Sequence, residues 1–358
     1  MTAERDGGSG AAPPGLSPPH IVSSPAVSAH GVRRRLRELL QGGLGDDAAP
    51  PLEAQGLRAP EAPRLVAARP IEGHALRAVR VDAAGDPTVA ALVAFLDGTQ
   101  ASHVVHYEDG LPIVLGRVAA VVRARRGRTM TTWARPIVVH RLYVPCAHLA
   151  APALAALDAA GPELVDTTAP EPDGSVPSPH PLALLERAVH FVQADRERAE
   201  RELAERWCRG EGDGLRAVLC VDGSIQSSEH LAAAPCVVGV VKSHRTLYVD
   251  GSALRTVLAL ARGERSTVFR VSVGRRQPVA SWYLRLRDPA GRDPMWGLVR
   301  IEAALPGAAE SPAAVEARFD AASRAVLAEA APLALPDGRW DKMVYPIRDC
   351  EQFLKAIC

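Results

Sequence analysis

Three segments of similar sequence constrain the fold of this chain more than any other feature. Each is an apolar run that ends in Asp-Gly: "VAFLDGTQASH" at 93–103, "VLCVDGSIQSS" at 218–228 and "LYVDGSALRTV" at 247–257. An apolar run followed by Asp-Gly is typical of a buried strand and a turn, because glycine tolerates positive φ angles and aspartate hydrogen-bonds to the local backbone. The question is which of the three aspartates does more than form a turn.

Capping explains the third segment without a ligand. Asp250 precedes Gly251 and Ser252, and Ser252 is the expected N-cap of a helix over 252–264. Asp97 and Asp222 differ, because we expect each at the carboxyl end of an apolar strand, where open α/β sheets place their ligands. Each is also followed by a glycine and a hydroxyl residue, which allows a ligand to approach the backbone closely.

The order of the remaining elements predicts an α/β fold. Residues 75–145 read as strands, with turns at Asp109-Gly110 and Arg126-Gly127. A Pro-rich loop is expected at about 160–180, and then a helix over 181–209, in which apolar residues recur at helical spacing. Further strands and helices over 311–330 and 348–358 complete a mixed sheet with helices packed on it.

The N-terminal region has a different composition. It is rich in Pro, Gly, Ser and Ala, apart from the basic segment "VRRRLRELL" at 32–40. We expect residues 1–64 to form a disordered tail with one short basic helix, which either docks a partner or has no role. Residues 65–358 are expected to form the folded domain.

Charge and cysteine content limit the function classes only weakly. The 42 basic and 41 acidic residues give a net charge of +1, which neither identifies nor excludes a protein that binds nucleic acid. The six cysteines show no C-x-x-C spacing, so we expect reduced thiols and a cytoplasmic protein. No apolar run approaches the ~18 residues of a membrane span, so no membrane partner is expected.

Asp97 and Asp222 flank a helix that carries glutamates, and this combination suggests a metal site. Hydrolysis of a phosphodiester by two divalent ions needs carboxylate oxygens that converge from different elements. The helix carboxylate is Glu200 or Glu202, which lie on the two borders of the apolar face. The sequence therefore predicts a two-metal site for Mn²⁺ or Mg²⁺, and it does not choose between the two glutamates.

Several motifs resemble those of the NurA nucleases, which process DNA ends together with the HerA-type hexameric ATPase. They are "FLDGTQ", "CVDGSIQS", "VVGVVKSH", the pair "SWYLRLRD…WGLVRIEAAL" and "MVYPIRDCEQFLKAI", in the family's order over about 80–358. The resemblance implies an RNase H-like fold and a metal-dependent deoxyribonuclease that acts on single- or double-stranded DNA ends. It also implies a homodimer docked to the ATPase, with possible roles in DNA repair or phage defence.

Carried over by position, Asp97 and Asp222 are metal ligands, and Glu202 or Glu200 is the helix carboxylate between them. Tyr345 matches the late tyrosine of the family, but the histidine that usually follows Tyr-Pro is missing. We infer that Asp349 supplies the last carboxylate. The missing histidine leaves a second hypothesis open, a catalytically weakened subunit that binds DNA or the ATPase.

Basic residues near these motifs suggest contacts to DNA. Lys242 suits a phosphate contact, although a solvated loop lysine fits the sequence equally well. Arg123, Arg125 and Arg126 could follow a DNA backbone or lie at an exposed hairpin tip. The sequence contains no G-x-S-x-G, Walker A, G-x-G-x-x-G or H-E-x-x-H motif that would support another standard enzyme class.

Overall fold

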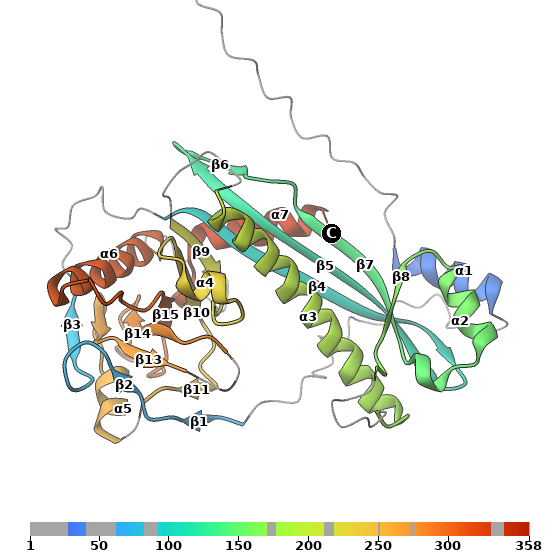
Figure 1. Ribbon diagram of the computed structural model, residues 1–358, viewed down its shortest axis with the longest axis horizontal. Coiled ribbons are helices and arrows are strands. Elements are labelled where there is room, and N and C mark those ends of the chain that lie inside the picture. Colours follow the sequence, from blue (N-terminus) through green and yellow to red (C-terminus); the bar gives the residue numbers. More distant parts are fainter. Residues whose placement is uncertain are drawn as a thin grey trace, which may run out of the picture.

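The protein is a mixed α/β fold built on one large sheet (Figure 1). The computed structural model describes residues 28–40, 62–81, 92–169, 177–210, 218–249, 251–272, 274, 276–330 and 340–357. The order of the main sheet is β2-β13-β14-β15-β10-β9-β4-β5-β7-β8, with three short strands, β3, β6 and β12, paired at its borders. Strands β1 and β11 form a separate two-stranded sheet.

The strands differ greatly in length, and the two longest form one hairpin. The strands are β1 Arg64–Leu65, β2 Arg69–Pro70, β3 Ala78–Arg80, β4 Leu92–Glu108, β5 Leu111–Arg126, β6 Thr129–Thr132, β7 Ile137–Val144, β8 Glu163–Asp166, β9 Val218–Asp222, β10 Val237–Val241, β11 Thr246–Leu247, β12 Glu264–Ser266, β13 Phe269–Val271, β14 Val279–Arg285 and β15 Leu298–Ala303. The helices are α1 Ala29–Leu39, α2 Ala151–Asp158, α3 Pro181–Cys208, α4 Glu229–Ala233, α5 Gly251–Leu258, α6 Pro312–Ala330 and α7 Tyr345–Ile357, with 3-10 turns η2 Cys146–His148 and η3 Trp340–Lys342.

Five neighbouring strands form the centre of the sheet. β4, β5 and β7 are an antiparallel meander, and β9 and β10 run parallel to β4 on its other side. The predicted turn at Asp109-Gly110 is confirmed, because both residues have positive φ angles, 49° and 79°. The turn at Gly127, with φ 60°, likewise joins β5 to β6.

Helices cover both faces of this centre, and alternation along the strands decides which side chains each helix meets. On one face α3 packs through Val192 and Leu203 against Leu96 and Val221. On the other face α6 and α7 pack against Phe95 and its neighbours. Figure 1 shows α3 crossing β4 and β5, with α7 behind them. The predicted helices over 181–209 and 311–330 are confirmed as α3 and α6.

The basic N-terminal segment forms α1, and this helix packs on its own chain. Val32 and Leu36 are buried with Leu115 and Leu142 of the sheet, and Arg33 donates a hydrogen bond to the carbonyl of Val104 at 2.8 Å. The sheet covers the apolar face of α1, so this helix is part of the folded unit. The rest of the expected tail, 1–27 and 41–61, lies outside the described residues.

Three local expectations were wrong. Asp97 does not end its strand: β4 continues to Glu108 because β5 supplies a hydrogen-bonding partner along its whole length, with Asp97 opposite Val121. The loop expected at 160–180 contains β8, which extends the sheet beside β7. Helix α5 begins at Gly251, one residue before the expected cap Ser252, and Asp250 lies outside the described residues. Among the helices described, none has an apolar stretch that could span a bilayer.

Candidate metal centre

Asp97 and Asp222 lie side by side on neighbouring parallel strands. In the β4–β9 ladder Leu96 pairs with Val221, so the next residue on each strand is an aspartate at the same level. Asp97 shares its face with Phe95, and Asp222 shares its face with Cys220, because side chains two apart on a strand point the same way. Phe95 and Cys220 belong to the core beneath α7, so both carboxylates project on the α7 side.

Helix α7 brings a third carboxylate to this pair. Oxygen atoms of Asp97, Asp222 and Glu351 all lie within 4.8 Å of one another. The neighbouring residue on α7 anchors the helix there, since the Cys350 thiol donates a hydrogen bond to the carbonyl of Phe95 at 3.3 Å. Three oxygen donors from three separate elements are a ligand set that suits a hard divalent cation such as Mg²⁺ or Mn²⁺.

Glu200 approaches from the opposite face of the sheet, through the gap left by a glycine. A Cβ atom built on Gly98 would lie 2.3 Å from Glu200 Oε1, so the carboxylate of this α3 residue rests on the glycine backbone next to Asp97. Arg196, one turn earlier, forms an ion pair with Glu200 and donates a hydrogen bond to Gln100 at 3.1 Å. Glu200 is therefore held in place from both α3 and β4.

Burial and crowding raise the pKa of two of these carboxyls. The pKa of Asp97 rises to about 8, first because the side chain is buried and then because Asp222 is negatively charged. Lys242 acts against this rise, while Glu200 and Glu351 add to it. Burial also raises the pKa of Glu200 to about 7, although Arg196 opposes it. Without a cation, Asp97 therefore holds a proton at neutral pH and Glu200 is about half protonated, as expected where carboxylates are confined together.

Lys242 forms an ion pair with one member of the cluster. Its Nζ lies 2.8 Å from Asp222 Oδ1, and its side chain is about one quarter exposed (27%). It follows the last residue of β10, where Val240 is paired with Asp222. The ammonium group thus neutralises part of the acidic charge and still reaches solvent.

A buried glutamate fixes the loop that follows Asp222. Glu302 of β15 is fully buried and accepts hydrogen bonds from Ser224 Oγ (2.8 Å), Ile225 N (2.9 Å) and Gln226 Nε2 (2.8 Å). Its charge is balanced by Arg300, whose Nη1 lies 2.5 Å away. The loop after the Asp-Gly turn therefore has a fixed path, and Gly223 adopts φ 125° within it.

Other residues expected in the site are not part of the carboxylate cluster. Glu202 is exposed on α3, and Tyr345 is the first residue of α7. Asp349 does not join the cluster: its Oδ1 lies 2.6 Å from Arg123 Nε. Glu351 was missed, although the sequence carried a signal. It follows Ile347 by four residues and precedes Leu354 by three, so it borders the buried stripe of α7.

The arginines of the β5 hairpin serve the fold. Arg123 pairs with Asp349 and also donates to Thr132 Oγ1 at 2.8 Å. Arg125 forms a two-pronged ion pair with Glu329 of α6, at 2.5 and 2.7 Å. Arg126 is exposed at the turn. The first two hold α7 and α6 against β5, so this strip is neither a free hairpin tip nor a continuous basic track.

No family model matches this sequence, and no curated protein matches it significantly. The residues of the site are therefore the basis for a function.

Proposed function

We propose that the protein is a metal-dependent nuclease that hydrolyses phosphodiester bonds in DNA. The observation that carries the proposal is the convergence of Asp97, Asp222 and Glu351, with oxygens within 4.8 Å of one another. Glu200 lies on the other face of β4, against Gly98, and its negative charge acts on Asp97. Carboxylates collected in this way from separate elements are typical of sites that hold divalent ions for phosphoryl chemistry.

The sheet supports the finer assignment to an RNase H-like fold. An antiparallel meander, β4-β5-β7, is followed by the long helix α3 and then by two strands parallel to β4. The carboxylates come from the first strand of the meander, from α3, from β9 and from the last helix. The resemblance to the NurA nucleases extends the proposal to DNA ends, a homodimer and a HerA-type hexameric ATPase as partner in the cytoplasm.

The donor set fits the cation that the proposal requires. Burial and neighbouring negative charge raise the pKa of Asp97 to about 8, and a bound cation would relieve both the repulsion and the desolvation of these carboxylates. Asp97, Asp222 and Glu351 are the residues that would hold it. Once bound, Mg²⁺ or Mn²⁺ polarises the phosphate and lowers the pKa of attacking water.

The other residues act on charge and protons. Glu200, with a pKa of about 7, can hold or release a proton beside Asp97 at neutral pH. Lys242 places its positive charge beside Asp222, where it can contact a phosphate oxygen of the substrate. Glu302 holds the 223–226 loop, which keeps Asp222 in register with Asp97.

One observation favours the second candidate, a binding subunit with weakened turnover. Asp222 is already paired with Lys242, and Glu200 is already paired with Arg196. These cations neutralise part of the charge that would attract a metal ion. This candidate predicts binding of DNA without cleavage, whichever metal is supplied.

A cleavage assay with linear DNA separates the two candidates. The nuclease proposal predicts degradation with Mn²⁺ or Mg²⁺, none with EDTA, and a fall of about 10³-fold or more in Asp97→Asn and Asp222→Asn. Glu202→Gln is the matched control, because that glutamate is exposed on the same helix as Glu200. Metal-dependent cleavage that persists in both aspartate variants would rule out this site.

A further inference from the structure

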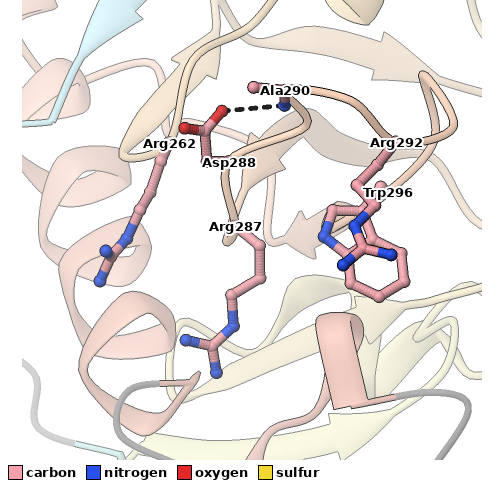
Figure 2. A pocket seen from close by; sticks show the side chains of 6 residues that line it. All are labelled: Arg262, Arg287, Asp288, Ala290, Arg292 and Trp296. Carbon is pink, nitrogen blue, oxygen red and sulfur yellow. Dashed lines mark hydrogen bonds between the residues drawn. The ribbon is translucent and has the colours of Figure 1, made fainter. Parts of the chain in front are cut away.

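A basic cavity lies apart from the acidic centre, between the hairpin that joins β14 to β15 and Arg262, which lies between α5 and β12. Its volume is about 330 Å³, and its lining residues are Arg262, Arg287, Asp288, Ala290, Arg292 and Trp296 (Figure 2). Figure 2 shows Arg292 lying across the indole ring of Trp296, while Arg262 and Arg287 extend on the other side. The Arg292 guanidinium is 5.2 Å from the ring centroid.

The charge of the cavity selects an anion. Three arginines and a single carboxylate, Asp288, line the cavity, and Asp288 accepts a hydrogen bond from Ala290 N at 3.0 Å. Arg262 and Arg292 are exposed, and within the part of the chain that the structure describes neither forms an ion pair with a carboxylate. Planar guanidinium groups match the oxygens of a phosphate and bind them with two parallel hydrogen bonds.

The hairpin that carries the lining residues other than Arg262 is tightly braced. Arg285, which is fully buried, donates hydrogen bonds to the carbonyls of Pro294 and Trp296. Arg287 donates to the carbonyl of Ala330, and a Cβ on Gly297 would lie 2.7 Å from Arg287 Cβ. Gly297 also has φ 64°, so only glycine permits this approach without strain. The backbone of the hairpin is therefore fixed before any ligand arrives, which lowers the entropic cost of ordering it on binding.

The cavity lies at the same edge of the sheet as the acidic centre. Val240 of β10 pairs with Asp222 on one side and with Ile301 of β15 on the other. β15 begins at Leu298, so its hairpin projects beyond the edge where β9 ends. Three strand spacings separate β14 from β9, which is about 14 Å across the sheet, and Leu298 lies three residues, about 10 Å, beyond the level of Asp222. DNA advances about 3.4 Å per nucleotide along one strand of a duplex, so one strand of about five or more nucleotides spans the combined distance.

We propose that this cavity binds a phosphate group of the DNA whose scissile bond lies at the acidic centre. The inference rests on the proposed nuclease function and adds a second contact to it, several nucleotides from the cleaved bond. The phosphate is either a terminal monoester or an internal phosphodiester, and both present the same oxygens to Arg262 and Arg292. Lys242 and this cavity then fix one strand at two points along the sheet edge.

Binding of oligonucleotides to the full chain tests the proposal without any need for cleavage. The variant is Arg262→Gln with Arg292→Gln, because both side chains are exposed and neither braces the hairpin. The matched control is Arg34→Gln with Arg35→Gln, which removes the same charge from the exposed face of α1. The probe is a fluorescent single strand of about 20 nucleotides in EDTA, with affinity measured by anisotropy at several salt concentrations.

We expect the cavity variant to bind about tenfold more weakly and to lose about 2 from the salt slope, while the control changes by less than about twofold. Equal affinity of the cavity variant and the wild type overturns the proposal. An equal loss in the control also overturns it, because general charge then explains the binding. Circular dichroism and thermal midpoints, unchanged in both variants, show that folding is intact.

Two further measurements complete the experiment. The first uses a probe with a 5′-hydroxyl in place of a 5′-phosphate. If its affinity for the wild type is as low as the affinity of the 5′-phosphorylated probe for the cavity variant, the cavity binds a terminal monoester. Unchanged binding of the hydroxyl probe identifies an internal phosphodiester. A cleavage assay of the wild type and of Asp97→Asn tests the nuclease function separately. If neither protein cleaves DNA, the nuclease proposal is wrong. The affinity of the cavity variant for DNA is measured without cleavage, so it still tests the phosphate-binding proposal.

Discussion

The backbone of Gly98 lies directly beneath the carboxylate of Glu200, so close that a Cβ atom at position 98 would stand 2.3 Å from Glu200 Oε1. This contact joins α3 to β4 at the residue next to Asp97. In sequence Asp97-Gly98 resembles a turn, but Gly98 is part of the strand and pairs with Ala120. The glycine is there because a helix carboxylate takes the space of its side chain.

Gly98→Ala should displace Glu200. The atom that the new methyl group meets is the end of a flexible side chain, so the loss of stability should be only about 1 kcal/mol. Metal-dependent cleavage should fall by about tenfold or more, because Glu200 leaves the neighbourhood of Asp97. Urea denaturation and cleavage of linear DNA measure the two effects. Gly307→Ala is the control, since a Cβ atom at that position would lie 3.6 Å from Glu310 Oε1, an ordinary van der Waals distance. Unaltered cleavage by Gly98→Ala would contradict the role of Glu200.

Glu351 and Asp349 should behave differently, although they are two residues apart on α7. Glu351→Gln removes one of the three converging carboxylates, so Mn²⁺ affinity and cleavage should each fall by about 10²-fold. Asp349→Asn removes only the ion pair with Arg123, which should cost about 1 kcal/mol and leave cleavage within about threefold of wild type. Calorimetric titration with Mn²⁺ and a cleavage assay provide the measurements. The reverse order of effects would return the metal site to Asp349.

Stability without metal should fall as the pH rises from about 4 to about 8. In the folded chain Asp97 has a pKa of about 8, against its usual 3.8, so over this range the folded state binds a proton that the unfolded state has lost. The unfolded state binds fewer protons, and the free energy of unfolding therefore decreases with pH. Asp97→Asn should be more stable than wild type in EDTA at pH 8, by about 2 kcal/mol or more, with little difference at pH 4.

The same group makes metal binding depend on pH. A cation must displace the proton of Asp97, so the apparent affinity for Mn²⁺ should rise up to about pH 8. Titrations in buffers of different ionisation enthalpy report the protons released. An affinity for Mn²⁺ that is constant between pH 6 and pH 8 would show that Asp97 is not a ligand.

Glu302→Gln should cost more stability than any surface change. The glutamine keeps one acceptor oxygen, but its NH₂ group is a hydrogen-bond donor that faces the donors of the 223–226 loop. Arg300 also loses its negatively charged partner in the core. We expect a loss of about 3 kcal/mol in denaturant titrations. Glu310→Gln is the control, because Glu310 is exposed and pairs with Arg318 at the surface, where the loss should stay below about 1 kcal/mol. A similar small loss for Glu302→Gln would mean that the 223–226 loop is held by other contacts.

Much of the fold could be predicted from the pattern of apolar residues. The long helix α3, the helix α6 and the hairpin turn at Asp109-Gly110 follow from periodicity and from turn chemistry, which act within a few residues. Strand β8 could not be predicted, because four residues between Pro-rich segments gain their stability from pairing with β7. The length of β4 was likewise underestimated, since the partner strand β5 maintains its hydrogen bonds beyond Asp97.

The candidate site was predictable to the extent that its residues belong to strands. Asp97 and Asp222 each follow an apolar run, and that local pattern marked both. Glu200 could not be chosen over Glu202 from the helix alone, because the choice depends on the glycine that Glu200 meets across the fold. Arg123, Arg125 and Asp349 were assigned to DNA or metal from their charge, whereas their partners lie hundreds of residues away in the sequence.

The sequence by itself determined the mixed sheet with its flanking helices, and it marked two aspartates at the ends of apolar runs, because periodicity and turn propensity are local properties of the chain. Only the tertiary structure decided which carboxylates meet. The parallel register of β4 and β9 sets Asp97 beside Asp222, and the packing of α7 turns Glu351 towards them while Asp349 faces Arg123. Ion pairs and hydrogen bonds form only between groups a few ångströms apart in space, and the order of residues along the chain does not specify those distances.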